Sequence, residues 1–286
     1  MNNDRSIKLE EKTDAIVVIR YLPSALARQL VREKKRGTTI IIVLDDDLLD
    51  EGSHIELGLL YRWKLYKQTS QYKKRFEAYV DELWVASKYL LRKYGSFARN
   101  KDIQIDLMSL NPKPDLLSMD SRLRIRYSST SSHESEWPWV IGLLEKIQSS
   151  LQNSVIEIVV PPKWRRRFRH IPRLVMLYPM DFETYESWID SSQVDIFLVP
   201  VLNSHFGKAR AHTKVIECAR MHAVGLYSKR APYERYVDNG VNGFLIGDDY
   251  NSWVEKVVEL SSDRSFMSEI SKRNRIMSQD LIANNL

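Results

Sequence analysis

The stretch that decides the fold runs from Val194 to Gly247 and reads VDIFLVPVLNSHFGKARAHTKVIECARMHAVGLYSKRAPYERYVDNGVNGFLIG. Its first seven residues, 194–200, are an apolar run that is typical of a buried strand. A polar loop follows, then a helical segment around Glu217, a second apolar strand and a turn that leads to a third. This order of strand, loop, helix and strand predicts a parallel βαβ unit.

Two charged residues of this stretch lie on one face of its predicted helix. Lys214 and Glu217 are three residues apart, and residues at that spacing share a helix face. The loop before the helix contains Gly207, so the N-terminal end of the helix can face a ligand. Backbone amides at such an end favour a phosphate, and a carboxylate one turn further in can accept hydrogen bonds from sugar hydroxyls. The pair predicts a site for a nucleotide-diphosphate sugar, and the alternative is an ion pair on a solvated helix face.

The same alternation of strands and helices extends over the rest of the chain. A segment with two prolines, 111–117, separates two blocks of it and predicts an interdomain linker. We therefore predict an α/β protein of two Rossmann-like domains, a short one at 1–114 and a second at 115–286, with ligands at the carboxyl ends of strands in a cleft between them. The predicted strands are 14–21, 38–44, 82–87, 103–110, 123–129, 155–161, 173–179 and 194–200, and the predicted helices include 24–36, 55–79, 137–151 and 182–190.

The bulk composition is that of an ordinary globular protein. Of 286 residues, 43% are hydrophobic and 28% are charged, so a sizeable core is expected. No apolar run reaches the length of a membrane-spanning helix, and the N-terminal segment lacks the apolar region of a secretory signal. The single cysteine, Cys218, fits a reducing compartment. We expect a cytoplasmic protein, with peripheral contact at the inner face of the membrane left open.

The net charge of +6 suits partners that carry phosphate. Nucleotide sugars, anionic lipid surfaces and nucleic acid all qualify, and charge does not choose among them. The densest basic run, 163–170, and the basic segment 61–76 with its Tyr and Trp residues could contact RNA or a membrane surface. The simpler interpretation of 163–170 is a solvated loop. The simpler interpretation of 61–76 is a packed helix whose lysines reach solvent. No motif for RNA or DNA binding accompanies them, so no nucleic-acid partner is predicted.

The stretch 194–247 also resembles a known family, the family 4 glycosyltransferases of the GT-B fold, in their donor half. The shared pattern is an apolar strand ending in proline, a loop, a Lys-x-x-Glu helix, a strand, and the sequence Asn-Gly-x-Asn-Gly-Phe-Leu-Ile. The resemblance covers most of residues 120–275 and, more weakly, residues 14–112. The residues that carry it are Pro200, Phe206, Lys214, Glu217, Ser228, Pro232, Tyr233, Asp238, Gly240, Asn242, Gly243 and Phe244.

The resemblance implies transfer of a sugar from a nucleotide-diphosphate sugar to a glycan, lipid-linked or protein acceptor, as in polysaccharide biosynthesis. It implies a retaining reaction without an essential metal or cofactor. Glu217 would bind the ribose hydroxyls and Lys214 the diphosphate, with Arg210 and Lys163 as further donor-binding candidates. The family motif has two glutamates eight positions apart, and the earlier position here is Ala209.

A Ser/Thr-rich loop, 128–137, follows the first strand of the second domain. Its hydroxyls and backbone amides suit a phosphate, and in related glycosyltransferases a loop at this place borders the donor site. Ser129, Thr130 and His133 are therefore donor-binding candidates. The alternative is an N-cap for the helix that begins at Trp137, with Ser135 as the cap and His133 exposed.

Three aspartates, Asp45, Asp46 and Asp47, end the strand 38–44 and are expected to face the cleft. Clustered carboxylates cannot all ionise cheaply when dehydrated. We expect Asp46 or Asp45 to be catalytic, acting on an acceptor hydroxyl as a base or hydrogen-bond partner. Arg20, at the end of the first strand, is expected on the acceptor side. Asp47 is expected on the same side. The alternatives are that these carboxylates bind a metal ion or cap the N-terminus of the next element.

Two rival functions remain open at this point. The short first domain and Ala209 favour a non-catalytic or partner-dependent glycosyltransferase subunit. A nucleic-acid-binding protein would use the basic segments 61–76 and 163–170. Hydrolases and ATPases find no support, because the sequence contains no Gly-x-Ser-x-Gly, Walker or His-Glu-x-x-His motif.

Overall fold

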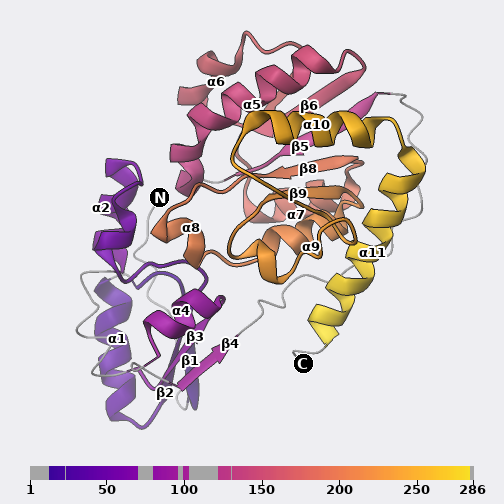
Figure 1. Ribbon diagram of the computed structural model, residues 1–286. Helices are drawn as coiled ribbons and strands as arrows, with labels where there is room; N and C mark the ends of the chain where they lie inside the picture. Colours follow the sequence, from indigo (N-terminus) through magenta and orange to yellow (C-terminus); the bar gives the residue numbers. More distant parts are fainter. Residues whose placement is uncertain are drawn as a thin grey trace. The chain divides into compact units, whose positions relative to one another are not determined.

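The computed structural model describes residues 13–22, 24–69, 80–95, 99–102, 122–129 and 131–283 (Figure 1). The chain divides into two compact units. Unit 1 comprises Met1–Gln104 and Ser204–Ala211, and unit 2 comprises Ile105–Asn203 and His212–Leu286. The predicted strand at 103–110 and the predicted linker at 111–117 lie outside the described residues.

Unit 1 is built on a parallel sheet. Its described strands follow the order β1-β2-β3-β4, and each neighbouring pair is parallel. The central strand β2 is a run of Ile, Val and Leu, which suits a strand covered on both faces. The edge strand β4 is polar, and it begins before the strand that the sequence predicts at 103–110. The strands are β1 (Ala15–Ile19), β2 (Thr39–Leu44), β3 (Glu82–Val85) and β4 (Arg99–Asp102).

The helices of unit 1 follow its strands. Helix α1 (Ser24–Lys35) ends as predicted, because Gly37 takes a left-handed φ of 93° that turns the chain toward β2. Between β2 and β3 lie the 3-10 helix η1 (Glu51–His54) and α2 (Leu59–Gln68), and α4 (Lys88–Lys93) follows β3. The rest of the helix predicted at 55–79, residues 70–79, lies outside the described residues.

A segment from the second half of the sequence completes unit 1. Residues Ser204–Ala211 contain the short helix α8 (His205–Ala209), where the sequence predicts a loop, and Ser204 caps it by accepting from the Gly207 amide at 2.8 Å. Phe206 and Ala209 are buried in the hydrophobic core of unit 1. The Ala211 amide donates to the Asp45 carbonyl at 3.1 Å, so the segment also supports the loop after β2.

Unit 2 contains a second, larger parallel sheet. Its described strands follow the order β10-β9-β8-β5-β6-β7, and every neighbouring pair is parallel. Parallel strands joined by helices confirm the predicted α/β class and the second Rossmann-like domain. The strands are β5 (Leu123–Tyr127), β6 (Ser154–Val159), β7 (Leu174–Leu177), β8 (Ile196–Val199), β9 (Val224–Ser228) and β10 (Phe244–Ile246).

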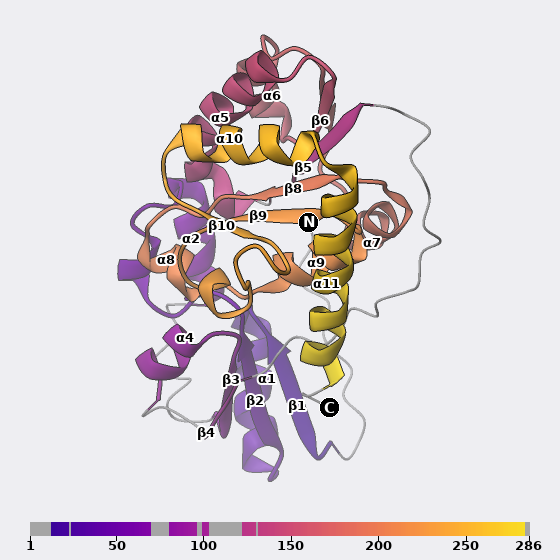
Figure 2. The same cartoon turned by 45° about the vertical axis from the view of Figure 1, so that its right-hand side comes forward.

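Helices cover both faces of this sheet. Helices α5 and α10 lie on one face, α7 and α9 lie on the other, and α11 runs past the sheet to pack against α9 (Figures 1 and 2). The helices are η3 (Ser131–Glu136), α5 (Trp137–Ser150), α6 (Pro162–Phe168), α7 (Phe182–Ser191), α9 (Thr213–Arg220), η4 (Tyr233–Arg235), α10 (Tyr250–Ser261) and α11 (Arg264–Ala283).

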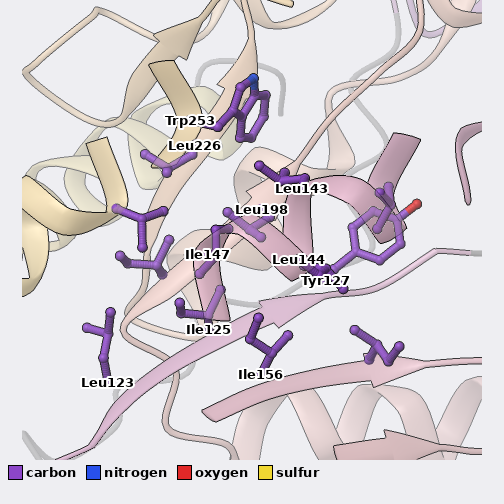
Figure 3. Close-up of a cluster of buried hydrophobic side chains, with 14 of the residues drawn as sticks. Leu123, Ile125, Tyr127, Leu143, Leu144, Ile147, Ile156, Leu198, Leu226 and Trp253 are labelled. Atoms are coloured by element: carbon purple, nitrogen blue, oxygen red, sulfur yellow. The ribbon is translucent and has the colours of Figure 1, made fainter. Parts of the chain in front are cut away.

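The central strand β8 shows why both faces are covered, since all four of its residues are apolar and buried. Ile196 and Leu198 join the core beneath α5 and α10, where Leu198 lies near Ile147 and Leu226 (Figure 3). Phe197 joins the core on the opposite face. Side chains alternate between the faces of a strand, so an unbroken apolar run needs a helix layer on each side.

The basic run at 163–170 differs from the expected loop, because most of it forms α6. Pro162 stands in the first turn of that helix, where proline costs no hydrogen bond. Phe168 anchors it by packing against Trp137, with ring centroids 5.3 Å apart. The run is therefore a helix with one buried face rather than a fully solvated loop.

The turn that contains Asn-Gly-x-Asn-Gly is held by its own residues. Asn242 accepts from the Asp238 amide at 2.7 Å and donates to the Tyr236 carbonyl at 2.9 Å. Gly240 has a left-handed φ of 81°. A Cβ on Gly243 would lie 3.1 Å from the Gly225 carbonyl oxygen. These residues of the family pattern shape the backbone here.

Across the described ranges, no helix combines the length and the apolar character needed to cross a membrane.

Candidate functional site

The strand order of unit 2 points to one place for a ligand. From β5 the chain first builds β6 and β7 on one side, and it then returns to build β8, β9 and β10 on the other. The reversal lies between β5 and β8, where Ile125 pairs with Ile196. In open parallel sheets, ligands bind outside the carboxyl ends of the two strands at such a switch point.

Four polar side chains meet at these carboxyl ends. Ser128 directly follows β5, Lys214 and Glu217 lie on α9 in the connection from β8 to β9, and Tyr185 lies on α7. We call them the switch-point cluster. The Lys214 ammonium donates to Glu217 Oε2 at 2.6 Å, and the Tyr185 hydroxyl donates to the same oxygen at 2.8 Å. The Lys214 ammonium also lies 3.3 Å from Ser128 Oγ and 3.2 Å from the Tyr185 hydroxyl. The Tyr185 hydroxyl is in turn 3.0 Å from Ser128 Oγ.

The charges of the cluster are buried but paired. Only 15% of the Lys214 side chain and 7% of the Glu217 side chain is exposed. Burial lowers the pKa of Lys214, but the Glu217 carboxylate and the Tyr185 hydroxyl outweigh it and hold this pKa above its ordinary value. Burial, and then the Glu217 charge, raise the pKa of Tyr185. The ammonium therefore stays charged at neutral pH, and the ion pair lies on a buried face rather than a solvated one.

The loop after β5 holds three of the predicted donor-binding residues. Ser129 Oγ is buried and has no hydrogen-bond partner in the part of the chain that the structure describes. Thr130 lies outside that part. His133 Nδ1 lies 2.8 Å from Glu136 Oε2. Glu136 stands at the N-cap of α5 without a side-chain capping bond, so the loop does not cap this helix through Ser135.

Helix α6 is tied to that loop through one carboxylate. Lys163 forms an ion pair with Glu134 of η3, although 62% of its side chain is exposed, and the Trp164 indole N–H donates to the same carboxylate. Trp164 also stacks on Trp137 with ring centroids 5.7 Å apart. Lys163 is thus linked to the loop after β5, but it does not contact the switch-point cluster.

A second group of charges lies in unit 1, at the carboxyl ends of β1 and β2. The Arg20 guanidinium pairs with the Asp45 carboxylate and donates to Asp46 Oδ2 at 2.7 Å. Arg20 adopts a left-handed φ of 63°, a sparsely populated conformation that costs a non-glycine residue about 1–3 kcal/mol. The structure therefore brings together three of the residues that the sequence predicted for the catalytic and acceptor side.

Asp45 has an unusual environment within this group. Burial, and then the neighbouring Asp46 charge, raise the pKa of Asp45 to about 6, although Arg20 opposes the shift. Its Oδ1 atom is buried and has no hydrogen-bond partner among the described residues. A carboxyl group with such a pKa can take up or release a proton near neutral pH.

Asp47 is placed differently, because its side chain has no exposed surface. Its carboxylate accepts from the Tyr94 hydroxyl at 2.5 Å and from the Lys93 ammonium at 2.6 Å, and Ser53 also donates to it. The His54 ring lies 2.6 Å from the Asp47 carbonyl. Asp47 therefore supports the loop after β2 from inside and does not present its carboxylate to an acceptor.

Arg210 and Ala209 belong to unit 1, although α9 follows them directly in sequence. The Arg210 guanidinium lies 5.5 Å from the centre of the Phe206 ring, and Arg210 is buried. Ala209 is also fully buried. Arg210 therefore falls in a different unit from Lys214 and Glu217.

Sequence reasoning missed Ser128 and Tyr185. Ser128 lies one position before the residues chosen from the Ser/Thr-rich loop, and its place directly after a strand could have singled it out. Tyr185 lies in a predicted helix with no local feature to distinguish it. In the described residues, no group of three or more His, Cys, Asp or Glu side chains is placed to hold a metal ion.

No family model matches the chain, and no curated protein matches it in sequence. Solved structures do match it in fold. TarM has a TM-score of 0.67 at 8% identity, over 95% of this chain and 53% of TarM. Sucrose-phosphate synthase from Thermosynechococcus elongatus has a TM-score of 0.64 at 12% identity, over 94% of this chain and 69% of that protein. HepE from Anabaena, in complex with UDP and glucose, has a TM-score of 0.60 at 14% identity, over 95% of this chain and 75% of HepE.

The chain spans about half the length of TarM. The three matched proteins have the GT-B fold, and likeness at this level of identity shows the fold alone. It confirms the resemblance in architecture that the sequence indicates: the chain has a GT-B-like fold of two Rossmann-like units.

Proposed function

We propose that this chain takes part in glycosyl transfer, moving a sugar from a nucleotide-diphosphate sugar to a glycan, lipid-linked or protein acceptor. The switch-point cluster carries the proposal, because it sets a buried carboxylate and a buried ammonium at the ligand position of unit 2. The fold supports it, since one matched structure, HepE, holds UDP and glucose. Retention of configuration and independence of metals remain part of the proposal.

Glu217 would bind the ribose of the donor. Lys214 and Tyr185 both donate to its Oε2 atom, and no described residue forms a hydrogen bond with its Oε1 atom. A carboxylate oxygen accepts hydrogen bonds from hydroxyl groups. A ribose hydroxyl at Oε1 would leave the existing network intact.

The diphosphate would be held by Lys214 and by the loop after β5. The Lys214 ammonium is a compact charge that is already oriented by three partners. Ser129 offers a buried hydroxyl without a hydrogen-bond partner among the described residues. Stabilising the leaving diphosphate by such donors is the way in which a site of this kind lowers the barrier. Arg210 and Lys163 are further candidates for contact with the diphosphate, although neither belongs to the switch-point cluster.

The acceptor would be activated in unit 1 by the aspartates after β2. Asp45, with its raised pKa and its buried, unpartnered Oδ1 atom, is better placed than Asp46 to accept a proton or a hydrogen bond from an acceptor hydroxyl. Arg20, which pairs with both carboxylates, would hold Asp45 in position, and the Asp46 charge would help to keep the pKa of Asp45 raised. Asp47 has no part in this scheme.

A thermal-shift panel with UDP, GDP, dTDP and their sugars tests the proposal. A ligand that binds only the folded chain at a hundredfold excess over Kd stabilises it by about 2.7 kcal/mol. We expect one nucleotide to stabilise the wild type and to have little effect on Glu217→Gln. Glu269→Gln, an exposed substitution on α11, is the matched control and should respond like the wild type. If no nucleotide stabilises the wild type, the chain does not hold a donor by itself.

A partner-dependent subunit is the second candidate function. Ala209 favours it, because this position of the family motif is a fully buried alanine and offers no carboxylate to the transferred sugar. Such a subunit would bind the nucleotide but neither transfer nor hydrolyse the sugar when alone. Measuring release of nucleotide diphosphate from the sugar donor separates the two, since an active enzyme releases it without a second protein.

A further inference from the structure

Helix α2 of unit 1 presents large apolar side chains to solvent. Leu59 is 78% exposed, Leu60 is 83% exposed, Trp63 is 60% exposed and Tyr66 is 45% exposed, and Ile55, just before the helix, is 68% exposed. In the described part of the chain, no other helix carries so many exposed large apolar residues. A contiguous group of this kind marks an interaction surface.

The four helical residues lie on one face. With about 3.6 residues per turn, Leu59, Leu60, Trp63 and Tyr66 fall within a stripe roughly 120° wide. The opposite face contains Leu65, which is fully buried in the core of unit 1. The helix is therefore apolar on two sides, and the core uses only one of them. We call the other side the outer stripe.

Basic residues border the outer stripe. Arg62 lies on one flank and Lys64 on the other, while Lys67 lies within the stripe at the last turn of the helix, with its ammonium 4.1 Å from the centre of the Trp63 ring. Helix α2 has no acidic residue. An apolar stripe with Trp and Tyr, flanked by cations, is the pattern of a helix that lies in the plane of an anionic lipid surface.

We propose that the outer stripe docks on an anionic membrane surface. Its leucines and Trp63 would enter the boundary of the acyl chains, while Arg62, Lys64 and Lys67 would contact the lipid headgroups. This inference goes beyond the proposed function and does not depend on it, because no residue of the stripe belongs to either charged cluster.

Charge argues against two other occupants. A symmetric contact with a second copy would bring the cations of both helices into one interface, and α2 has no acidic residue to pair with them. A nucleic acid would engage the cations but would leave Leu59 and Leu60 in water. Exposed basic residues of α6, such as Arg166 and Arg167, would suit a polyanion, but that helix has no comparable apolar stripe.

Co-sedimentation with vesicles tests the inference. The vesicles contain phosphatidylcholine with or without phosphatidylglycerol. We expect the wild type to bind the anionic vesicles and to bind the neutral ones much more weakly. Leu60→Ser with Trp63→Ser should weaken binding at all salt concentrations. Lys64→Glu with Lys67→Glu should weaken it by about tenfold or more, mainly at low salt.

Two matched controls locate the effect. Ile276→Ser removes an exposed apolar side chain from α11 and should bind like the wild type. Arg166→Glu with Arg167→Glu reverses the charge of α6 and should also bind nearly like the wild type. All substituted positions are exposed, and the nucleotide thermal shift reports separately on the fold and on the donor site.

The inference is overturned if the stripe variants bind as well as the wild type, or if only the α6 variant loses binding. It is also overturned if the wild type binds no anionic vesicles, and a concentration-dependent dimer that Leu60→Ser with Trp63→Ser abolishes would then assign the stripe to a second copy. A loss of binding confined to the two stripe variants establishes it, whether or not the chain binds a nucleotide.

Discussion

The Tyr185 hydroxyl donates a hydrogen bond to Glu217 Oε2 at 2.8 Å, and so joins α7 to the carboxylate of α9 at the switch point of the sheet. The same hydroxyl lies 3.2 Å from the Lys214 ammonium. Tyr185 thereby orients both charged groups that we propose for the donor. It reaches them from a helix more than twenty residues earlier in the sequence.

Tyr185→Phe should weaken nucleotide binding while the fold is kept. The change removes one hydrogen bond to a charged group, so we expect a loss of about 1.5–3 kcal/mol in stability. We also expect Glu217 to lose its fixed orientation and the Kd for the nucleotide to rise. Calorimetric titration measures this Kd. Tyr178→Phe, at an exposed position, is the control, and an unchanged Kd in Tyr185→Phe would contradict the positioning role.

The buried pair of Lys214 and Glu217 should show strong coupling. Removing one partner leaves the other charge buried and unpaired, so Lys214→Ala and Glu217→Ala should each cost about 3–5 kcal/mol. The double variant should cost clearly less than the sum of the two. Urea unfolding of the four proteins measures the coupling. Additive losses would mean that the two side chains do not stabilise each other.

Asp45 should make stability fall as pH rises. Its folded pKa of about 6 lies above its unfolded value, so the folded chain binds more protons than the unfolded chain between about pH 4 and pH 6. Its contribution to stability is therefore lost as pH rises through that window, by up to about 3 kcal/mol. Asp45→Asn should remove this fall.

Asp249 provides a control of opposite sign for that experiment. It caps α10, and its hydrogen bonds from the Ser252 amide and side chain lower its pKa. Its stabilising contribution is present above the unfolded pKa and is lost as pH falls. Urea unfolding at a series of pH values should show opposite changes of slope for Asp45→Asn and Asp249→Asn. A slope that Asp45→Asn leaves unchanged would contradict the environment described for Asp45.

Phe206 should be needed for the stability of unit 1. It is fully buried in that core, although it comes from a segment between two strands of unit 2. Phe206→Ala should cost about 3–5 kcal/mol through lost burial and a cavity. Limited proteolysis should then cut unit 1 more readily. Phe182→Ala, at an exposed position, should change little, and equal behaviour of the two variants would contradict the placement of α8.

Much of the fold could be predicted because its signals are local. The apolar run at 194–200 and the spacing of Lys214 and Glu217 sufficed for a parallel strand, a helix and a charged pair. The return of the chain between 204 and 211 into unit 1 has no such signal. His205–Ala209 is short and polar enough to read as a loop, and apart from the Ser204 cap its helix rests on the burial of Phe206 and Ala209 in the core of unit 1.

The candidate sites show the same limit. Asp45, Asp46 and Arg20 could be grouped in advance, because the ends of neighbouring parallel strands meet at one edge of a sheet. Asp47 could not be told apart from them, since its burial depends on Tyr94 and Lys93, which lie more than forty residues away.

The outer stripe of α2 could not be predicted from the sequence for a different reason. Apolar residues on both faces blur the helical periodicity that normally identifies a surface helix. Leu65 and Leu60 look alike in the sequence, but only Leu65 is buried. The sequence therefore favours a packed helix, and a membrane contact is the alternative interpretation. It does not show which apolar residues remain exposed.

Calorimetric titration of the nucleotide selected by the thermal-shift panel into wild type, Glu217→Gln and Glu269→Gln tests the proposed donor site most sharply. We predict one site in the wild type, an affinity at least about tenfold lower in Glu217→Gln because a hydrogen bond to a charged group is lost, and no change in Glu269→Gln. Equal affinity in all three proteins would contradict the assignment of the switch-point cluster as the donor site.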